Sequence, residues 1–469
     1  MIKRTLFFIA AICSGLSICA QDVESRLNKA VQQLLNDVQM KHAILGFYVV
    51  NGNTGKAVCN NNGGVGLAPA SSQKVITSAA AMELLGESFR YSTLLGYNGS
   101  IDNNVLNGNL VLSGQGDPTF GSSRYPSNNA ASVVKRITQA LEKNGITDIE
   151  GNLVLDNSAF SYQPLPGGWI WDDIGNYYGA GSWALNWNEN AYDLLLKPGS
   201  REGDAVTITG TRPDLQVARI NSLLKTGKPG SGDNGYIYLP PYTMMGFAEG
   251  TIPPGGVFSI SGALPNPAYQ VGWEVQKALE QRKIKLAGQA EILTALDQPV
   301  AKQVYTTVLD TLYSPSLDSI VYWFLHKSIN LYGEALLKTL ALQQGKQGST
   351  DNGLTVLRNF WKDNGIETSA LKVQDGSGLS PQNRVTPEAM VQVLQYARTR
   401  PWFNSYYKAF PLYNDMKMKS GTIGGSKAFT GYHTAKDGTP YTFAIIINGY
   451  DGSPSTLVQK MYRVLNELR

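Results

Sequence analysis

The stretch from Leu67 to Gly86 constrains the fold of this chain most, because it predicts a helix that starts at a polar corner. Pro69 stands just before the predicted start, Ala, Met, Glu and Leu fill the body, and Gly86 follows the last apolar pair as a stop signal. Ser71 and Lys74 are three residues apart, so both lie on one face of the first turn. A hydroxyl beside an amine, next to the unpaired N–H groups of a first turn, is suited to form an activated nucleophile.

The Ser-x-x-Lys motif decides nothing by itself. Ordinary Ser and Lys usage gives roughly two such matches by chance in a chain of this length. This chain holds five, which begin at Ser71, Ser132, Ser222, Ser369 and Ser405. The residues that single out one of them must come from elsewhere in the chain.

Residues 1–20 are typical of a secretory signal peptide. They combine a short basic head, an apolar centre too short to span a bilayer, and small residues before a cleavage site expected after Ala20. Cys19 would suit lipoprotein processing, but Ile18 stands where a small residue is wanted, so that alternative is the weaker one. No later segment is apolar enough to cross a membrane. We therefore expect a periplasmic protein without a membrane span.

Charge and cysteine content exclude two further classes. The formal net charge of +4 falls to +2 when Lys3 and Arg4 leave with the signal peptide, because residues 1–20 contain no acid. This balance gives no reason to expect a nucleic-acid partner. Cys59 alone remains after cleavage, so no intrachain disulfide can form and the core must hold without one.

The histidines do not form a recognisable catalytic or metal-binding pattern. They are far apart and lack the spacing of zinc proteases: His42, His326 and His433. A Gly-x-Ser-x-Gly elbow is also absent from the sequence. An enzyme built from this chain would therefore work without a histidine base, a bound metal or another cofactor.

Apolar periodicity predicts a mixture of helices and strands. Helices are expected over residues 22–40, 130–143, 268–281, 351–363, 386–398 and 455–468. Strands are expected over residues 43–51, 109–113, 151–156, 416–421, 428–434 and 441–448. Between these groups, one helix after Pro315 breaks and a second starts near Ser328.

The character of the chain changes near residue 95 and returns near residue 298, which indicates an insertion. We therefore expect an outer domain over 21–95 and 298–469 and an inserted α/β domain over 96–190 and 262–297. Short strands divided by Pro and Gly fill 191–261 and predict a small all-β domain nested inside the insertion.

Three elements are needed by serine acyl-transfer enzymes that lack histidine. They are a nucleophile with a nearby amine, a polar pair that shuttles protons, and a basic residue on an edge strand that binds a carboxylate. The chain offers them in the order Ser71-Ser-Gln-Lys74, Ser328-Ile-Asn330 and Lys419-Ser-Gly421.

Two decoys match the second and third elements but have a different context. Ser127-Asn-Asn129 follows Pro126 in a loop-like stretch, and Lys225-Thr-Gly227 runs into a Gly-rich loop with no strand expected to follow. Lys419-Ser-Gly421 ends a predicted strand and precedes a hairpin, where a substrate backbone can align along the sheet edge. Context therefore favours Ser328-Ile-Asn330 and Lys419-Ser-Gly421 over the two decoys.

The chain resembles the D-alanyl-D-alanine carboxypeptidase/endopeptidase family, the low-molecular-mass class C penicillin-binding proteins. The following motifs match in order: Pro69-Ala-Ser71-Ser-Gln-Lys74-Val, Gly116-Asp-Pro118, Ser328-Ile-Asn330-Leu-Tyr with Glu334-Ala-Leu-Leu, Asp375-Gly-Ser-Gly-Leu-Ser380 and Lys419-Ser-Gly-Thr422. The likeness covers essentially the whole mature chain. It implies an α/β (α+β) protein whose outer domain is serine β-lactamase/DD-peptidase-like, an antiparallel sheet flanked by helices, with two nested inserted domains, the inner one all-β.

The resemblance also implies catalytic roles. Ser71 attacks the carbonyl of the penultimate D-Ala and forms an acyl-enzyme, while Lys74, if neutral, takes its proton. Burial and the nearby Lys419 cation both disfavour a charged amine there. Ser328 relays a proton to the departing amine, and Asn330 positions Lys74 and the substrate amide.

Substrate binding is implied for the strand that carries Lys419. This lysine and the hydroxyls of Ser420 and Thr422 bind the terminal carboxylate, and Gly421 belongs to the same substrate-binding run. Backbone N–H groups of Ser71 and Thr422 form an oxyanion hole, which contributes about 3 kcal/mol per donor in such sites.

One departure from the family concerns the side chain of the third stem residue. Relatives that grip the free end of diaminopimelate resemble this chain at Asp156, with Phe160 nearby, but they carry an Arg where this chain has Pro381. Arg384 is close in sequence. Asp156 as a binding residue and Asp156 as an ordinary strand-end carboxylate that bonds the backbone both remain open.

The implied function is a serine-type D-alanyl-D-alanine carboxypeptidase, with DD-endopeptidase action as well, that cleaves peptidoglycan stem peptides and binds β-lactam antibiotics covalently. A serine β-lactamase is an alternative, although no loop Glu suited to deacylation lies between Asn330 and Lys419, and Glu334 is on a helix. A non-catalytic peptidoglycan-binding protein is another. The balance of the two peptidase activities and the oligomeric state stay open, a homodimer included.

Overall fold

The computed structural model describes residues 23–216, 218–297 and 304–469, so the predicted signal peptide lies outside the described residues. The chain forms two compact units. The first contains the chain up to Glu83 together with Val321–Ser328 and Arg358–Arg469, and the second contains Leu84–Ile320 and Ile329–Leu357. The boundaries of these two units differ from the boundaries of the three domains expected from the sequence. The three-domain division stays a prediction.

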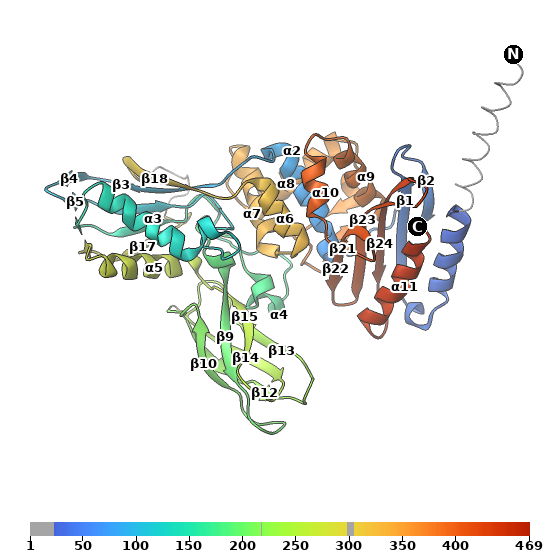
Figure 1. Ribbon diagram of the computed structural model, residues 1–469, viewed down its shortest axis with the longest axis horizontal. Coiled ribbons are helices and arrows are strands. Elements are labelled where there is room, and N and C mark those ends of the chain that lie inside the picture. Colours follow the sequence, from blue (N-terminus) through green and yellow to red (C-terminus); the bar gives the residue numbers. More distant parts are fainter. Residues whose placement is uncertain (1–22, 217, 298–303) are drawn as a thin grey trace, which may run out of the picture. The chain divides into compact units, whose positions relative to one another are not determined.

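A six-stranded antiparallel sheet forms the centre of the first unit (Figure 1). Its strand order is β2-β1-β24-β23-β22-β21. The strands are β1 (Ile44–Asn51), β2 (Ala57–Asn61), β21 (Leu412–Tyr413), β22 (Met416–Ile423), β23 (Ser426–Thr434) and β24 (Pro440–Asn448). The predicted strands at both ends of the chain therefore pair with each other, since β1 and β24 lie side by side.

Helices cover both faces of this sheet, which explains why β24 is apolar without alternation. A helix over residues 23–35 and α11 (Pro454–Asn466) pack their apolar sides against one face in a shared core. On the other side, α9 (Pro387–Arg398) packs against β1, β23 and β24. Thr386 caps α9 by accepting a hydrogen bond from Ala389 N, and Pro387 occupies its first turn.

The predicted Ser71 helix has two parts. Residues Ala70–Gln73 form a 3₁₀ turn, η2, and Lys74–Leu85 form α2. Because α2 is buried on all sides from Lys74 to Met82, its apolar residues show no one-sided pattern. Four further helices are α6 (Leu317–His326), α7 (Asn330–Gln343), α8 (Thr350–Asp363) and α10 (Phe403–Ala409), of which α7 belongs to the second unit. A short ribbon pairs β19 (Leu371–Lys372) with β20 (Arg384–Val385).

The second unit contains two mixed sheets. The five-stranded sheet has the order β17-β8-β6-β3-β18 and the four-stranded sheet the order β16-β7-β5-β4. Their strands are β3 (Ser92–Tyr97), β4 (Ser100–Asp102), β5 (Val105–Asn107), β6 (Leu110–Ser113), β7 (Asp148–Ile149), β8 (Leu153–Asp156), β16 (Lys285–Leu286), β17 (Ala290–Leu293) and β18 (Thr307–Tyr313). Strands β6, β8 and β17 are parallel, as connections through α3 (Ala130–Lys143) and α5 (Pro267–Gln281) require.

A separate all-β part of the second unit has its own apolar core. It consists of β9 (Ala191–Lys197), β10 (Thr207–Arg212), β11 (Arg219–Ser222), β12 (Lys225–Thr226), β13 (Asn234–Tyr238), β14 (Met245–Ile252) and β15 (Phe258–Ala263), and the short α4 (Trp171–Ile174) packs against β13. Lys225 and Thr226 pair in parallel with β14, and the chain then runs through the expected Gly-rich loop, after which β13 follows.

None of the helices in the described part of the chain combines the length and the apolar character that a membrane crossing requires.

Candidate active site

The turn that carries Ser71 has a strained backbone. Ala70 has a φ of 48°, a left-handed conformation that is uncommon for an alanine, and its side chain is fully buried. The Ser72 hydroxyl donates to Pro69 O at 2.6 Å and so helps to fix the turn. The surrounding packing therefore determines the direction in which Ser71 leaves the backbone.

Lys74 is fully buried and contacts the predicted nucleophile directly. Its Nζ donates to Ser71 Oγ at 2.9 Å and to the carbonyl oxygen of Ser377 at 2.8 Å. The ring of Phe324, from α6, lies 5.7 Å from the same Nζ atom. Two hydrogen-bond acceptors and an aromatic ring thus surround this buried amine.

The carbonyl that accepts from Lys74 belongs to a loop built around Asp375. The Asp375 carboxylate, fully buried, accepts hydrogen bonds from Gly378 N at 2.8 Å, Ser380 N at 2.6 Å and Asn383 Nδ2 at 2.9 Å. Sequence reasoning matched this run to the family but assigned it no task. Its task in the structure is to hold the Ser377 carbonyl against Lys74.

Gln73 ties the same loop to the nucleophile turn. Its side-chain amide donates to Asp375 O at 2.8 Å, and Thr77 Oγ1 of α2 donates to Gly376 O at 2.7 Å. A side chain at Gly378 would meet Ala70 O at 2.1 Å, so a glycine is needed there, where φ is 84°. Hydrogen bonds and close packing therefore join the Asp375 loop to η2.

The substrate-binding strand predicted around Lys419 is β22. Its neighbour β21 pairs only with Met416 and Lys417, whereas β23 pairs with β22 from Lys417 to Ile423. In the described part of the chain, the run Lys419–Ile423 thus keeps one edge without a strand partner. Such an edge can accept an extended peptide by main-chain hydrogen bonds.

Lys419 lies on β22 with an exposed fraction of 2%, and its Nζ donates to Ser420 O at 2.9 Å. Burial holds the pKa of Lys419 well below its usual range, and the positive charges of Lys74 and Lys427 lower this pKa further. Strand β22 packs against η2, which carries Ser71, so Lys419 and the Ser71–Lys74 pair lie on neighbouring elements of the first unit.

Gly421 lets β22 approach the nucleophile turn. A Cβ atom at this position would stand 2.4 Å from Pro69 O and 2.8 Å from Ser72 N. Next to it, Thr422 is exposed, and its hydroxyl accepts a hydrogen bond from Lys427 Nζ at 2.6 Å. Sequence reasoning missed Lys427, which lies on the following strand.

The second predicted pair is divided between the two units. Ser328 ends the α6 segment of the first unit, is half-buried and has a φ of 60°. Asn330 begins α7 in the second unit, is 7% exposed, and donates from Nδ2 to Tyr178 O at 2.7 Å. Their roles toward Lys74 and the substrate stay predictions.

Asp156 ends β8 in the second unit, and its buried carboxylate accepts hydrogen bonds from two serines. It accepts from Ser113 Oγ at 2.7 Å, from Ser158 Oγ at 2.6 Å and from Ser158 N at 3.1 Å. This pattern is typical of a structural strand-end aspartate. In the first unit, Arg384 donates to Pro381 O and Asn383 O, both at 2.7 Å. Substrate binding by either residue stays a prediction.

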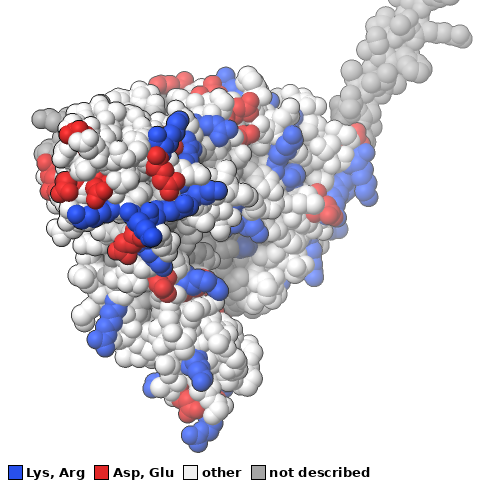
Figure 2. Space-filling model, turned by 60° about the vertical axis from the view of Figure 1, so that its left-hand side comes forward, with Lys and Arg blue, Asp and Glu red and all other residues white. Residues whose placement is uncertain are grey.

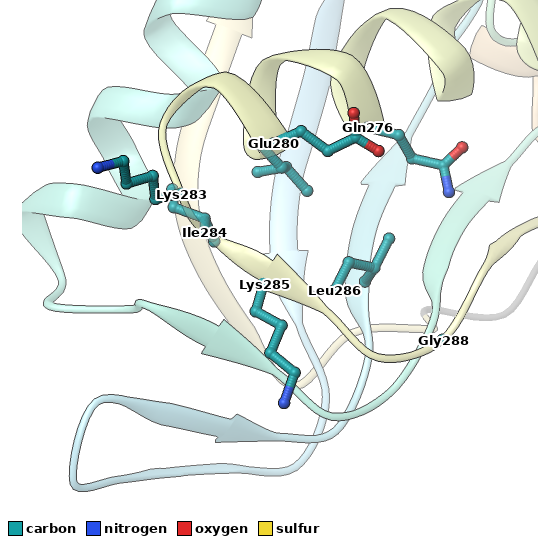
Figure 3. A pocket seen from close by; sticks show the side chains of 8 residues that line it. Gln276, Glu280, Lys283, Ile284, Lys285, Leu286 and Gly288 are labelled. Atoms are coloured by element: carbon teal, nitrogen blue, oxygen red, sulfur yellow. The ribbon is translucent and has the colours of Figure 1, made fainter.

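One pocket of the second unit carries no comparable chemistry. A pocket of about 520 Å³ at the end of α5 is lined by Gln276, Leu279, Glu280, Lys283, Ile284, Lys285, Leu286 and Gly288. Figure 3 shows Lys283 and Lys285 extending away from Glu280, so no nucleophile and base converge there.

Acidic and basic side chains are interspersed on the face in Figure 2. Within the described ranges, no cluster of three His, Cys, Asp or Glu could hold a metal ion.

The chain is similar to a known family and to known proteins over most of its length. The model of the D-Ala-D-Ala carboxypeptidase 3 (S13) family matches residues 27–467. The D-alanyl-D-alanine carboxypeptidase of Actinomadura sp. (strain R39) is 25% identical over 463 residues, covering 93% of this chain and 83% of that protein. The D-alanyl-D-alanine carboxypeptidase DacB of Haemophilus influenzae is 26% identical over 432 residues, covering 87% of this chain and 85% of its own.

A solved structure supports the fold. The crystal structure of penicillin-binding protein 4 (dacB) from Haemophilus influenzae superposes with a TM-score of 0.81 at 24% identity, covering 93% of this chain and 99% of that one. The same protein has been solved in complex with a β-lactam, with a TM-score of 0.75, the same identity and the same coverage. The expected fold class and the family resemblance are both confirmed.

Proposed function

The chain belongs to the D-Ala-D-Ala carboxypeptidase 3 (S13) family of serine peptidases, and from this premise we propose that it is a serine-type D-alanyl-D-alanine carboxypeptidase with Ser71 as its nucleophile. The observation that carries the assignment is the 2.9 Å contact between Lys74 Nζ and Ser71 Oγ. A hydroxyl that hydrogen-bonds a buried amine has a base within reach of its proton.

Acylation follows from this contact. The Ser71 oxygen attacks the carbonyl carbon of the penultimate D-Ala, and its proton moves to a neutral Lys74 amine. The tetrahedral intermediate then expels the terminal D-Ala by cleavage of the C–N bond, with Ser328 relaying a proton to the leaving nitrogen. Water later hydrolyses the ester and frees Ser71.

Recognition of the terminal carboxylate is assigned to β22. Lys419, Ser420 and Thr422 offer donors beside the open edge of the strand, and Gly421 allows this edge to approach the nucleophile turn. Backbone N–H groups of Ser71 and Thr422 are the proposed oxyanion hole, which adds about 3 kcal/mol of transition-state stabilisation per donor in such enzymes.

Partners and location follow from the same reasoning. We infer that peptidoglycan stem peptides are the substrates and that β-lactams acylate Ser71, in line with the β-lactam complex of the Haemophilus relative. A periplasmic location is supported by the signal-like residues 1–20. Cleavage of cross-links uses the same acyl-enzyme chemistry, so DD-endopeptidase action is included in the proposal.

We also infer three nested domains with boundaries near residues 95, 190, 261 and 298. Separate apolar cores support this division. One lies between the six-stranded sheet and the helices at 23–35 and α11, one lies between the mixed sheets and α3 and α5, and one lies inside the all-β part.

The test compares Ser71→Ala with Ser369→Ala, a serine of another Ser-x-x-Lys match that lies on the surface. Ser71→Ala is expected to abolish both D-Ala release and covalent labelling by a fluorescent penicillin, while Ser369→Ala keeps both. Retained D-Ala release in Ser71→Ala would disprove the assignment.

Rapid penicillin turnover by the wild type without a lasting adduct would instead support a β-lactamase. The products from purified sacculi would measure the amount of cleaved cross-linked dimers against the amount of released D-Ala.

A further inference from the structure

Lys427 lies beside the proposed carboxylate site but belongs to a different strand. In the antiparallel pairing of β22 and β23, Lys427 is the cross-strand partner of Thr422. The Lys427 Nζ atom donates to Thr422 Oγ1 at 2.6 Å and lies 5.2 Å from the centroid of the Phe429 ring. The side chain is half-buried, so it is held in place rather than extended into solvent.

This hydrogen bond fixes what the Thr422 hydroxyl can do. A hydroxyl has one proton to donate and two lone pairs to accept with, whereas a lysine ammonium can only donate. Because Lys427 already occupies a lone pair of Thr422, the hydroxyl proton stays available for an external acceptor. A substrate carboxylate, which only accepts when ionised, is the matching group.

Lys427 also adds positive charge at short range. A carboxylate oxygen that accepts from Thr422 Oγ1 at about 2.7 Å lies within about 5 Å of Lys427 Nζ. Burial lowers the pKa of Lys427, and its charge in turn lowers the pKa of Lys419. Lys427 thus influences the group that is expected to bind the carboxylate as well as the carboxylate itself.

We propose that Lys427 is a positioning and specificity residue of the carboxylate site, which holds the Thr422 hydroxyl as a donor and favours substrates with a free C-terminal carboxylate. This inference rests on the proposed function. Since Lys427 acts through Thr422 and through charge, its loss weakens the recognition of the carboxylate and leaves the Ser71–Lys74 chemistry in place.

The experiment uses the mature protein and two peptides that both end in D-Ala-D-Ala, one with a free C-terminal carboxylate and one with a C-terminal carboxamide. Lys427→Met is expected to lower kcat/KM for the carboxylate peptide about tenfold, mainly through KM, because a charge pair at this range contributes about one factor of ten. For the carboxamide peptide, the change is expected to stay within about twofold. Lys427→Arg, which keeps the charge and a donor, is expected to restore most of the loss.

Controls separate this role from a structural one. Lys436→Met removes an exposed lysine from the neighbouring hairpin turn and is expected to change neither peptide. In a Thr422→Val background, the selective effect of Lys427→Met is expected to shrink. An equal loss on both peptides, or no loss on either, would overturn the proposal without contradicting the proposed function, because the wild type would still cleave the carboxylate peptide. If the wild type released neither D-Ala from the carboxylate peptide nor D-alanine amide from the carboxamide peptide, the proposed function would fall and this inference with it.

Discussion

Replacing Gly421 by alanine tests whether the approach of β22 to the nucleophile turn is what makes the site work. The added Cβ would stand 2.4 Å from Pro69 O, 2.8 Å from Ser72 N and 3.1 Å from Ala70 Cβ. Two of these atoms belong to the backbone, which cannot rotate away as a flexible side chain can. Since ordinary contacts between such atoms begin near 3.5 Å, β22 and η2 must separate by about 1 Å.

This separation predicts a large kinetic effect with a modest effect on stability. Misplacement of reacting groups by about 1 Å can lower a rate about 100-fold, because the near-attack geometry is lost. Overpacking of this kind costs about 1–3 kcal/mol of the free energy of unfolding, which a large protein can tolerate. The second-order rate constant for acylation by a fluorescent penicillin is the direct readout, with thermal unfolding measured in parallel.

A neighbouring glycine provides the matched control. Gly424 lies in the turn that follows β22, and a Cβ added there would meet no atom within 4 Å. Gly424→Ala should therefore acylate at the wild-type rate. If Gly421→Ala also acylated within about threefold of the wild type while remaining folded, the geometric argument would be refuted, since a displacement of about 1 Å would then have no kinetic consequence.

Two further predictions concern buried titratable groups. Lys338 donates to the carbonyls of Gln163, Pro164 and Ser182, and burial lowers its pKa from 10.5 to about 7. Between pH 7 and 10.5 the unfolded chain therefore binds more protons than the folded chain. From pH 8 to pH 10, the free energy of unfolding of the wild type should rise by about 2 kcal/mol relative to that of Lys338→Met. Urea denaturation measures both values, and a difference between the two proteins that does not change with pH would contradict the prediction. Burial raises the pKa of Cys59 to about 11, so a thiol reagent at pH 8 should label a chain prepared without residues 1–20 only after unfolding. Rapid labelling of the folded protein would count against this prediction.

The sequence predicted the local elements near the site well because their signals are short-range. The apolar run that becomes β24 and the Pro-to-Gly span that becomes η2 and α2 both lie close to where periodicity and stop signals placed them. Context also selected Ser71 from five similar motifs, and the structure brings this residue together with Lys74 and Lys419 in the first unit.

Other features of the site could not be found in this way because they depend on pairs distant in sequence. The left-handed backbone of Ala70 lies in a turn against which the Asp375 loop packs, some 300 residues away along the chain. Lys427 becomes relevant only through the register that places it opposite Thr422. Neither residue type carries a local signal for these tasks, since Ala is usually right-handed and a strand lysine is usually solvated.

The lysines of the first unit make charge, rather than a specialised base, the central property of the site. Burial and mutual repulsion lower the pKa of Lys419, so the free site resists holding several protons at once. On the proposed roles, a bound carboxylate favours the charged form of Lys419, and a charged Lys419 opposes a second charge on Lys74. The proposed mechanism thus couples recognition of the substrate carboxylate to activation of Ser71 and needs no histidine base.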